Sequence, residues 1–212
     1  MGQAPFIAVE GPIGVGKTSL ASAFSKQFGF YFLKEIVEEN PFLHKFYDNI
    51  HEWAFQTEMF FLCNRYKQLG DMEKDYLRAG QPVVADYHIF KNIIFSRRTL
   101  NSEQFLKYEQ IYNILTHDLA KPNLIVYLTA DLEILLGRIK KRGRDFEYNI
   151  DPFYLQQLTV DYEEFMEKLP IPVVRIDVTN LDFVANPDDL KTIFSILHPA
   201  LEKRSINRNA SI

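Results

Sequence analysis

A glycine-rich segment that ends in lysine and threonine is the strongest chemical signal in this sequence. Residues 11–18 read GPIGVGKT and fit the phosphate-binding pattern G-x-x-x-x-G-K-S/T. In this pattern the glycines let backbone N–H groups wrap a phosphate chain, the lysine reaches the β- and γ-phosphates, and the hydroxyl ligates Mg²⁺. The segment therefore predicts a site for a nucleoside triphosphate with Mg²⁺. The residues expected to contact it are Gly11, Gly14, Gly16, Lys17, Thr18 and Ser19.

An acidic side chain near this site could activate an acceptor. Ligands of open parallel sheets collect at the carboxyl ends of the strands. Glu35 lies near the end of a predicted strand, where a carboxylate could accept a proton from an attacking hydroxyl group. Spacing alone does not separate it from Glu38 and Glu39, and a solvated acidic loop is the alternative interpretation.

Asp86 closes the apolar run PVVAD. An acid at the end of a strand is the usual second contact of Mg²⁺ in phosphate-loop proteins, often through water. The alternative is a helix N-cap for the segment that begins near Tyr87. The two roles are compatible, and the phosphate loop favours the metal role.

Basic residues cluster at 138–144, RIKKRGR, in an otherwise acidic chain. One interpretation is a solvated helix end that is capped by Gly143. However, Arg138 and Arg142 lie four residues apart on one helical face, and Arg144 follows the helix. Together with the phosphate loop, this spacing predicts a lid whose guanidinium groups neutralise charge on a transferred phosphoryl group.

Gln56 gives a weaker signal in the segment WAFQ. Its amide offers a donor and an acceptor, which suits the edge of a nucleobase, and Trp53 and Phe55 could stack on the ring. Aromatic stripes of this kind are more often part of a core. Tyr47 is equally ambiguous, and the five histidines show no metal-ligand spacing.

A parallel sheet is needed to position these side chains. Apolar runs alternate with helical patterns, which predicts an α/β fold: a five-stranded parallel sheet with helices on both faces, in one domain over residues 1–212. The expected strands are Phe6–Glu10, Tyr31–Val37, Pro82–Asp86, Leu124–Thr129 and Val173–Val178. The longest expected helix covers about 43–79 and could contact both the sheet and another subunit.

Composition narrows the classes of partner. The chain has 212 residues and a formal net charge of −4, which argues against nucleic acid as the main partner. Cys63 is the single cysteine, so no intramolecular disulfide forms, as suits a reducing cytosol. The sequence shows no signal-peptide pattern and no apolar stretch near the roughly 20 residues that span a bilayer. We therefore expect a cytoplasmic protein with no membrane partner.

The ordered set of motifs resembles the deoxyribonucleoside kinase family, and within it the deoxyguanosine and deoxyadenosine kinases of Gram-positive bacteria. The landmarks span nearly the whole chain: GPIGVGKT, EIVEENPFLHKFY, WAFQTEMFFLCNRYKQ, QPVVADYHIF, RIKKRGRDFE and LDF. The resemblance implies a three-layer P-loop kinase fold. It also implies transfer of a phosphoryl group from ATP, with Mg²⁺, to the 5′-hydroxyl of a purine 2′-deoxynucleoside. A homodimer, or a dimer with a related kinase subunit, is implied as well.

The resemblance also implies individual roles. Glu35 matches the carboxylate that deprotonates the 5′-hydroxyl, which separates it from Glu38 and Glu39. Gln56 matches the amide that pairs with the base. The other matches are Tyr47 and Glu147 for the 3′-hydroxyl, Arg138, Arg142 and Arg144 for a lid around 138–147, and Asp182 and Phe183 for a loop around 180–186 that holds the donor's adenine.

One departure from the family pattern lies at the third strand. The family usually reads acid-Arg-Ser there, and this chain reads Asp86-Tyr87-His88. The missing arginine usually approaches the 5′-oxygen and the glutamate base, so either Arg65 compensates or Tyr87 donates its hydroxyl. Relatives with the same DYH pattern favour deoxyguanosine, which implies a guanine preference. A preference for deoxyadenosine, or a broader specificity, is the alternative.

Two other functions compete with this one. A nucleoside monophosphate kinase such as thymidylate kinase has the same architecture, but it needs extra cations for the acceptor's phosphate, and the tyrosine at position 87 weakens that interpretation. A nucleotide-dependent switch or regulatory binding protein is a rival of another class. The sequence has no N-K-x-D-type signature, and a lid of arginines would serve no purpose in such a protein.

Overall fold

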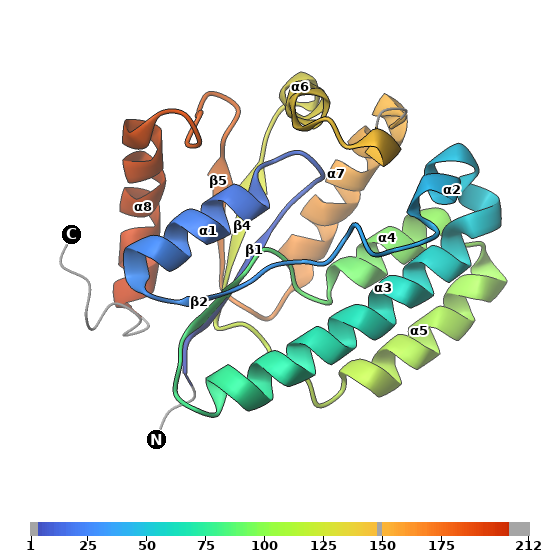
Figure 1. Cartoon of the computed structure of the whole chain (residues 1–212), viewed down its shortest axis with the longest axis horizontal. Helices are drawn as coiled ribbons and strands as arrows, with labels where there is room; N and C mark the ends of the chain where they lie inside the picture. Colours follow the sequence, from blue (N-terminus) through green and yellow to red (C-terminus); the bar gives the residue numbers. More distant parts are fainter. Residues whose placement is uncertain (1–3, 148–149, 204–212) are drawn as a thin grey trace.

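The computed structural model describes residues 4–147 and 150–203. Its centre is a five-stranded sheet in the order β2-β3-β1-β4-β5, in which every strand pair is parallel (Figure 1). The strands are β1 (Phe6–Glu10), β2 (Tyr31–Leu33), β3 (Val83–Ala85), β4 (Leu124–Thr129) and β5 (Val173–Asp177). Because all strands are parallel, the segments that follow β1, β2 and β3 meet at one edge of the sheet.

Helices cover both faces of the sheet and give the molecule three layers, which confirms the expected α/β architecture (Figure 1). On one face lie α1 (Lys17–Phe28) and α8 (Pro187–Glu202). The other side carries α3 (Ile50–Met72), α4 (Lys91–Thr99), α5 (Ser102–Thr116) and α7 (Pro152–Lys168). The helices α2 (Leu43–Asp48) and α6 (Leu132–Arg142) flank the end of the sheet at which β1 leads into α1.

Two apolar cores hold the layers together. One joins α1 and α8 to β1 and β4 through residues such as Leu20 and Leu197, and the other joins α3 and α5 to β3 through Leu62 and Tyr108. All four of these side chains are completely buried. The cores leave the carboxyl edge of the sheet to polar side chains.

The structure differs from the sequence-based expectation in two places that matter for function. The expected continuous helix over 43–79 is wrong, because α2 ends at Asp48 and Asn49 caps α3 by accepting a hydrogen bond from the backbone N–H of Glu52 (3.4 Å). Asparagine is a favoured N-cap, so this break has a local cause. The second strand ends at Leu33, which leaves Glu35 in the loop that follows it.

Within the described part of the chain, none of the helices is long and apolar enough to cross a membrane.

Candidate active site

A cavity of about 890 Å³ opens at the carboxyl edge of the sheet. Its walls come from the phosphate loop, the loop after β2, the helices α3, α4 and α6, and residues 179–184. The volume lies within the ~300–1,000 Å³ that small-molecule sites usually have. The sequence-predicted residues that line it are Gly14, Gly16, Lys17, Thr18, Ser19, Glu35, Tyr47, Arg65, Asp86, Arg138, Arg142, Arg144, Glu147, Asp182 and Phe183.

The phosphate loop joins β1 to α1 and requires glycine at several positions, of which Gly11 and Gly16 are two. Gly11 has a φ of 144° and Gly16 a φ of 105°, a region that side chains with a Cβ rarely adopt. A Cβ atom at Gly16 would also lie 2.6 Å from the ring of Phe183. Helix α1 begins at Lys17, so its unpaired N–H groups and its dipole favour an anion at the loop.

Lys17 is the first residue of α1, and its side chain turns back onto the phosphate loop. Its ammonium group donates hydrogen bonds to the carbonyl oxygens of Gly11 (2.8 Å) and Pro12 (2.9 Å). Burial, together with the nearby Lys91, lowers the pKa of Lys17 to about 7. A polyphosphate beside it would favour the charged form, because an opposite charge raises the pKa of an amine.

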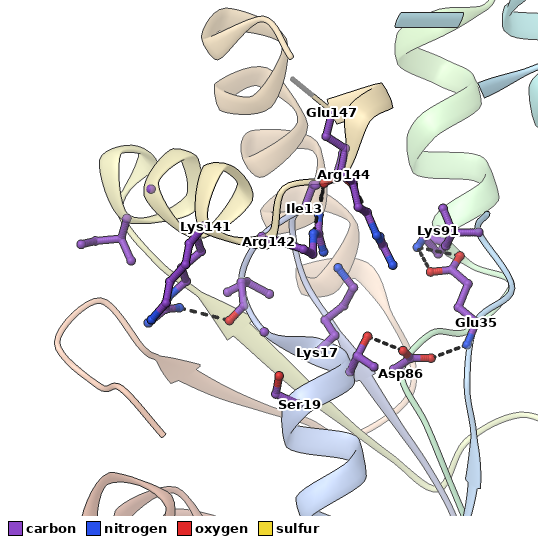
Figure 2. A pocket seen from close by; sticks show the side chains of 18 of the residues that line it. Ile13, Lys17, Ser19, Glu35, Asp86, Lys91, Lys141, Arg142, Arg144 and Glu147 are labelled. Carbon is purple, nitrogen blue, oxygen red and sulfur yellow. Dashed lines mark hydrogen bonds and ion pairs between the residues drawn. The ribbon is translucent and has the colours of Figure 1, made fainter. Parts of the chain in front are cut away.

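Asp86 connects the phosphate loop to the loop that carries Glu35 (Figure 2). Its Oδ2 accepts a hydrogen bond from the Thr18 hydroxyl (2.5 Å), and its Oδ1 accepts one from the backbone N–H of Glu35 (2.6 Å). A hydroxyl and a carboxylate are oxygen ligands that suit Mg²⁺, which usually takes only one or two protein ligands besides phosphate and water. The pair therefore fits a metal that is shared with a phosphate chain.

Glu35 is a buried carboxylate held between two cations. Arg65 donates to its Oε1 from Nε (3.0 Å) and Nη2 (2.5 Å), and Lys91 contacts both oxygens at 2.9 Å. Burial alone would raise the pKa of Glu35, but Lys91 and Arg65 outweigh it and lower the pKa to about 2. The carboxylate is therefore ionised at neutral pH, as a proton acceptor must be. Glu38 and Glu39 are exposed and do not line the cavity.

Two cations contact Glu35, and the sequence predicted only one of them, Arg65. Arg65 is in place, whereas the Tyr87 hydroxyl donates to Gln68 Oε1 (2.9 Å) and does not line the cavity. Lys91, at the start of α4, was not predicted to contact Glu35. The only sequence signal was a lysine, next to an asparagine, in the mainly apolar run IFKNIIF, and the structure buries this lysine to 6% exposure.

Glu147 and two arginines form a second charged group above the phosphate loop (Figure 2). The Arg142 Nε donates to Glu147 Oε2 at 3.1 Å, and Arg144 lies 3.5 Å from Oε1. Tyr47 lines the cavity together with Glu147. Burial raises the pKa of Tyr47, and the nearby charge of Glu147 raises it further. Figure 2 shows Arg142 and Arg144 pointing toward the space above Lys17.

Arg138 differs from the other two arginines of the predicted lid. Its guanidinium donates to the carbonyl oxygens of Val15 (3.2 Å), Val178 (2.9 Å) and Leu181 (2.8 Å), and lies 5.9 Å from the Phe183 ring centre. It therefore ties the phosphate loop to the 180–186 loop. In this structure these three bonds keep the Arg138 guanidinium on backbone carbonyl oxygens, so its expected role at the transferred phosphoryl group stays a prediction.

Gln56 is an expectation that needs correction. Its side chain is exposed and does not line the cavity, whereas Thr57, Glu58 and Phe61 of the same helix do. Residues two apart on a helix differ by about 200° around its axis, so Gln56 and Glu58 face opposite ways. Sequence reasoning missed Glu58 because the phase of α3 was not known.

The chain is similar in sequence and in fold to known kinases. The family model for deoxynucleoside kinases matches residues 7–199. A deoxyguanosine kinase of Bacillus subtilis (strain 168) is 55% identical over 91% of this chain and 96% of its own length. A deoxyadenosine/deoxycytidine kinase of the same organism is 28% identical over 93% of this chain and 95% of its own length. A solved structure of deoxyadenosine kinase from M. mycoides with bound dATP superposes with a TM-score of 0.79 at 26% identity, covering 92% of this chain and 99% of that chain.

Proposed function

This chain belongs to the deoxynucleoside kinase family, and from that premise we propose that it transfers the γ-phosphoryl group of ATP to the 5′-hydroxyl of deoxyguanosine. The observation that carries the reaction is the position of Glu35, which faces the same cavity as the phosphate loop and is ionised between Arg65 and Lys91. The choice of guanine is supported by the 55% identity to a deoxyguanosine kinase.

Different residues act on the phosphate donor and on the acceptor hydroxyl. The phosphate loop binds the β- and γ-phosphates, and Lys17, Arg142 and Arg144 supply positive charge around the transferred group. Thr18 and Asp86 would hold Mg²⁺, which when bound neutralises charge on the phosphate oxygens. Glu35 takes the proton from the 5′-hydroxyl as its oxygen approaches phosphorus.

The remaining residues position the two nucleosides. Tyr47 and Glu147 would hold the 3′-hydroxyl, which favours a 2′-deoxyribose that fits beneath them. Asp182 and Phe183 line the opposite end of the cavity beside Gly16, where the adenine of ATP would lie. The acceptor and the donor therefore enter from different sides of Lys17.

Phosphoryl transfer from radiolabelled ATP to the four natural deoxynucleosides tests the proposal. We expect deoxyguanosine to be the best acceptor, guanosine and thymidine monophosphate to be poor ones, and transfer to stop when a chelator removes Mg²⁺. Better use of deoxyadenosine would shift the specificity, and preferred use of thymidine monophosphate would replace the proposal with a nucleoside monophosphate kinase. Slow ATP hydrolysis without transfer to any acceptor would support a nucleotide-dependent binding protein.

Arg138 within α6 and Arg142 at its end should have different kinetic effects when replaced. We expect Arg142→Ala to lower kcat about 100-fold, a typical cost of one electrostatic contact to a transition state, with a small change in the KM for ATP. Arg138→Ala should instead raise the KM for ATP, because it loosens the loop that carries Phe183. Steady-state kinetics with both substrates varied distinguish the two. An effect of Arg142→Ala on nucleoside KM alone would contradict its role in transfer.

We also propose that the protein acts as a dimer, either of itself or with a related kinase subunit, through the α3–α5 side. Tyr66 on α3 is 42% exposed, and Leu106 and Ile114 on α5 are 60% and 77% exposed, an apolar group that a second copy would cover. We expect sedimentation equilibrium to give twice the chain mass of 24.8 kDa. A monomer mass that Ile114→Asp leaves unchanged would contradict this proposal.

A further inference from the structure

Glu58 on α3 is a buried carboxylate whose hydrogen-bonding capacity the protein does not meet. The residue is 2% exposed. Among the described residues, its Oε2 has no hydrogen-bond partner, and its Oε1 has only the Thr99 hydroxyl at 3.5 Å, which is long for a bond between oxygens. An unpaired buried carboxylate is costly, so its presence calls for an explanation outside the protein's own contacts.

The other buried glutamates show how unusual this is. Glu10, Glu35 and Glu147 each accept hydrogen bonds on the carboxylate, from a backbone N–H, from lysine or from arginine. Glu58 has no such donor, and burial raises its pKa to about 7 despite the attraction of Arg65 and Lys91.

Glu58 lies at the end of the cavity where the base of the acceptor would be. Arg65, which holds Glu35, follows Glu58 by seven residues on the same face of α3, a distance of about 10 Å along the axis. A nucleoside with its 5′-hydroxyl at Glu35 would extend over about this distance to the edge of its base. Apolar and aromatic side chains that suit a flat ring line the same cavity: Val37, Leu43, Phe46, Phe61 and Phe95.

We propose that Glu58 selects guanine, accepting hydrogen bonds from N1–H on one carboxylate oxygen and from the 2-amino group on the other. This inference rests on the proposed function and names the residue that determines its base specificity. A carboxylate has acceptors only, and guanine is the one natural base that presents two adjacent donors on its pairing edge. Two parallel charge-assisted bonds of this kind resemble the paired contact between arginine and a carboxylate.

The other bases meet the same carboxylate less well. Adenine places the N1 lone pair, and cytosine the N3 lone pair, where guanine has a donor, so one carboxylate oxygen faces an acceptor in a buried site. Sites that are built around a specific hydrogen bond reject analogues that lack it by large factors. The geometry therefore favours deoxyguanosine over deoxyadenosine through one side chain.

Glu58→Gln tests the proposal with a nearly unchanged side-chain shape. An amide offers one acceptor and one donor, which pair with adenine or guanine alike. We expect the ratio of kcat/KM for deoxyguanosine to kcat/KM for deoxyadenosine to fall about 100-fold, partly through a gain with deoxyadenosine. The matched control is Glu164→Gln, at a side chain on α7 that is 66% exposed, which should keep the wild-type ratio.

Two measurements on the wild-type protein decide the question even if Glu58→Gln does not fold. Deoxyinosine lacks the 2-amino group, so its kcat/KM should be about tenfold or more below that of deoxyguanosine, as the loss of a hydrogen bond to a charged group predicts. Lowering the pH from 8 to 6 should reduce the preference for guanine, because a protonated Glu58 can donate to adenine N1. The charged and titratable groups that act on Glu58 in this range are Arg65, Lys91, Tyr47, Tyr108 and Tyr154. None of these tyrosines titrates near neutrality, since burial raises the pKa of each.

The outcomes separate this inference from the proposed function. If the wild-type protein phosphorylates deoxyguanosine but Glu58→Gln keeps the wild-type ratio, or if deoxyinosine matches deoxyguanosine, Glu58 is not the determinant and the proposed function stands. If Gln56→Ala removes the guanine preference instead, the base contact comes from the opposite face of α3 and the inference is overturned. If the wild-type protein phosphorylates no deoxynucleoside, both fail.

Discussion

Replacing Glu35 with glutamine is expected to lower kcat about 1,000-fold while changing ATP affinity by less than about threefold, within the range that general base catalysis contributes. The amide keeps the shape of the side chain but does not accept a proton from the 5′-hydroxyl at neutral pH. In the proposed function ATP binds to the phosphate loop and the 180–186 loop, whereas the side chain of Glu35 contacts Arg65 and Lys91. Single-turnover transfer and equilibrium binding of a fluorescent ATP analogue give the two quantities separately.

Folding must be checked beside the kinetics, because Glu35→Gln leaves Arg65 and Lys91 buried without their anion. Breaking a buried ion pair from one side can cost about 3–5 kcal/mol of stability. Glu35→Asp keeps the charge and should fold more stably, yet it withdraws the carboxylate from the 5′-hydroxyl and should also be slow. A glutamine variant that is folded and turns over at a near-normal rate would remove Glu35 from the mechanism.

The lowered pKa of Glu35 also determines how the stability of the fold changes with pH. Its pKa is about 2 in the folded protein, against an ordinary value of 4.5. A carboxyl group with a lower pKa in the folded state stabilises the fold fully above its ordinary pKa, and this contribution is lost as the pH falls toward 2. Glu35 should therefore give no acid limb to the pH–rate profile between pH 5 and 8, and any limb in that range belongs to another group.

Local sequence patterns predicted the parts of the site that are themselves local. The phosphate loop needs only a strand, glycines and a helix start in succession, so Lys17 and Thr18 could be assigned from eight residues. Asp86 could be placed because a strand end is visible as the end of an apolar run. The strand order and the meeting of these segments at one edge follow from parallel topology.

Features that depend on helix phase or on packing between elements were beyond the sequence. Gln56 and Glu58 lie in the same segment, and only the orientation of α3 decides which one enters the cavity. The resemblance to the family implied that the amide of Gln56 contacts the base, so no such contact was predicted for the buried acid two residues later, Glu58. Similarly, Lys91 is 56 residues from Glu35 in sequence, and no local pattern links them.

Lys91 supplies a positive charge beside Glu35, which Tyr87 does not. A cation is expected beside the base where the family has an arginine at the strand end, and this chain has a tyrosine that turns toward Gln68. Lys91 reaches both oxygens of Glu35 from the first turn of α4, so the charge arrives from the next element instead. We therefore expect Lys91 to be a positioning residue, which acts on the reaction through the orientation and ionisation of Glu35.

Replacing Lys91 with methionine is expected to lower kcat about 100-fold at pH 7, equivalent to ~3 kcal/mol of transition-state stabilisation. Two causes contribute: Glu35 loses a contact that fixes both oxygens, and the pKa of Glu35 rises because the strongest lowering influence is gone. The pH–rate profile should then gain an acid limb from Glu35, which gives none between pH 5 and 8 in the wild-type protein. Lys91→Arg should recover much of the rate, and Lys107→Met, at an exposed side chain on α5, is the matched control.

The shape of that profile separates positioning from simple loss of structure. If Lys91 acts through the ionisation of Glu35, the methionine variant should recover part of its rate as the pH rises, because Glu35 then becomes deprotonated without help. If the rate stays low by the same factor at every pH, the fixed orientation of the carboxylate matters more than its charge. A Lys91→Met protein with wild-type kcat and an unchanged profile would show that Arg65 alone holds the base, and that Arg65 rather than Lys91 compensates for the tyrosine at the strand end.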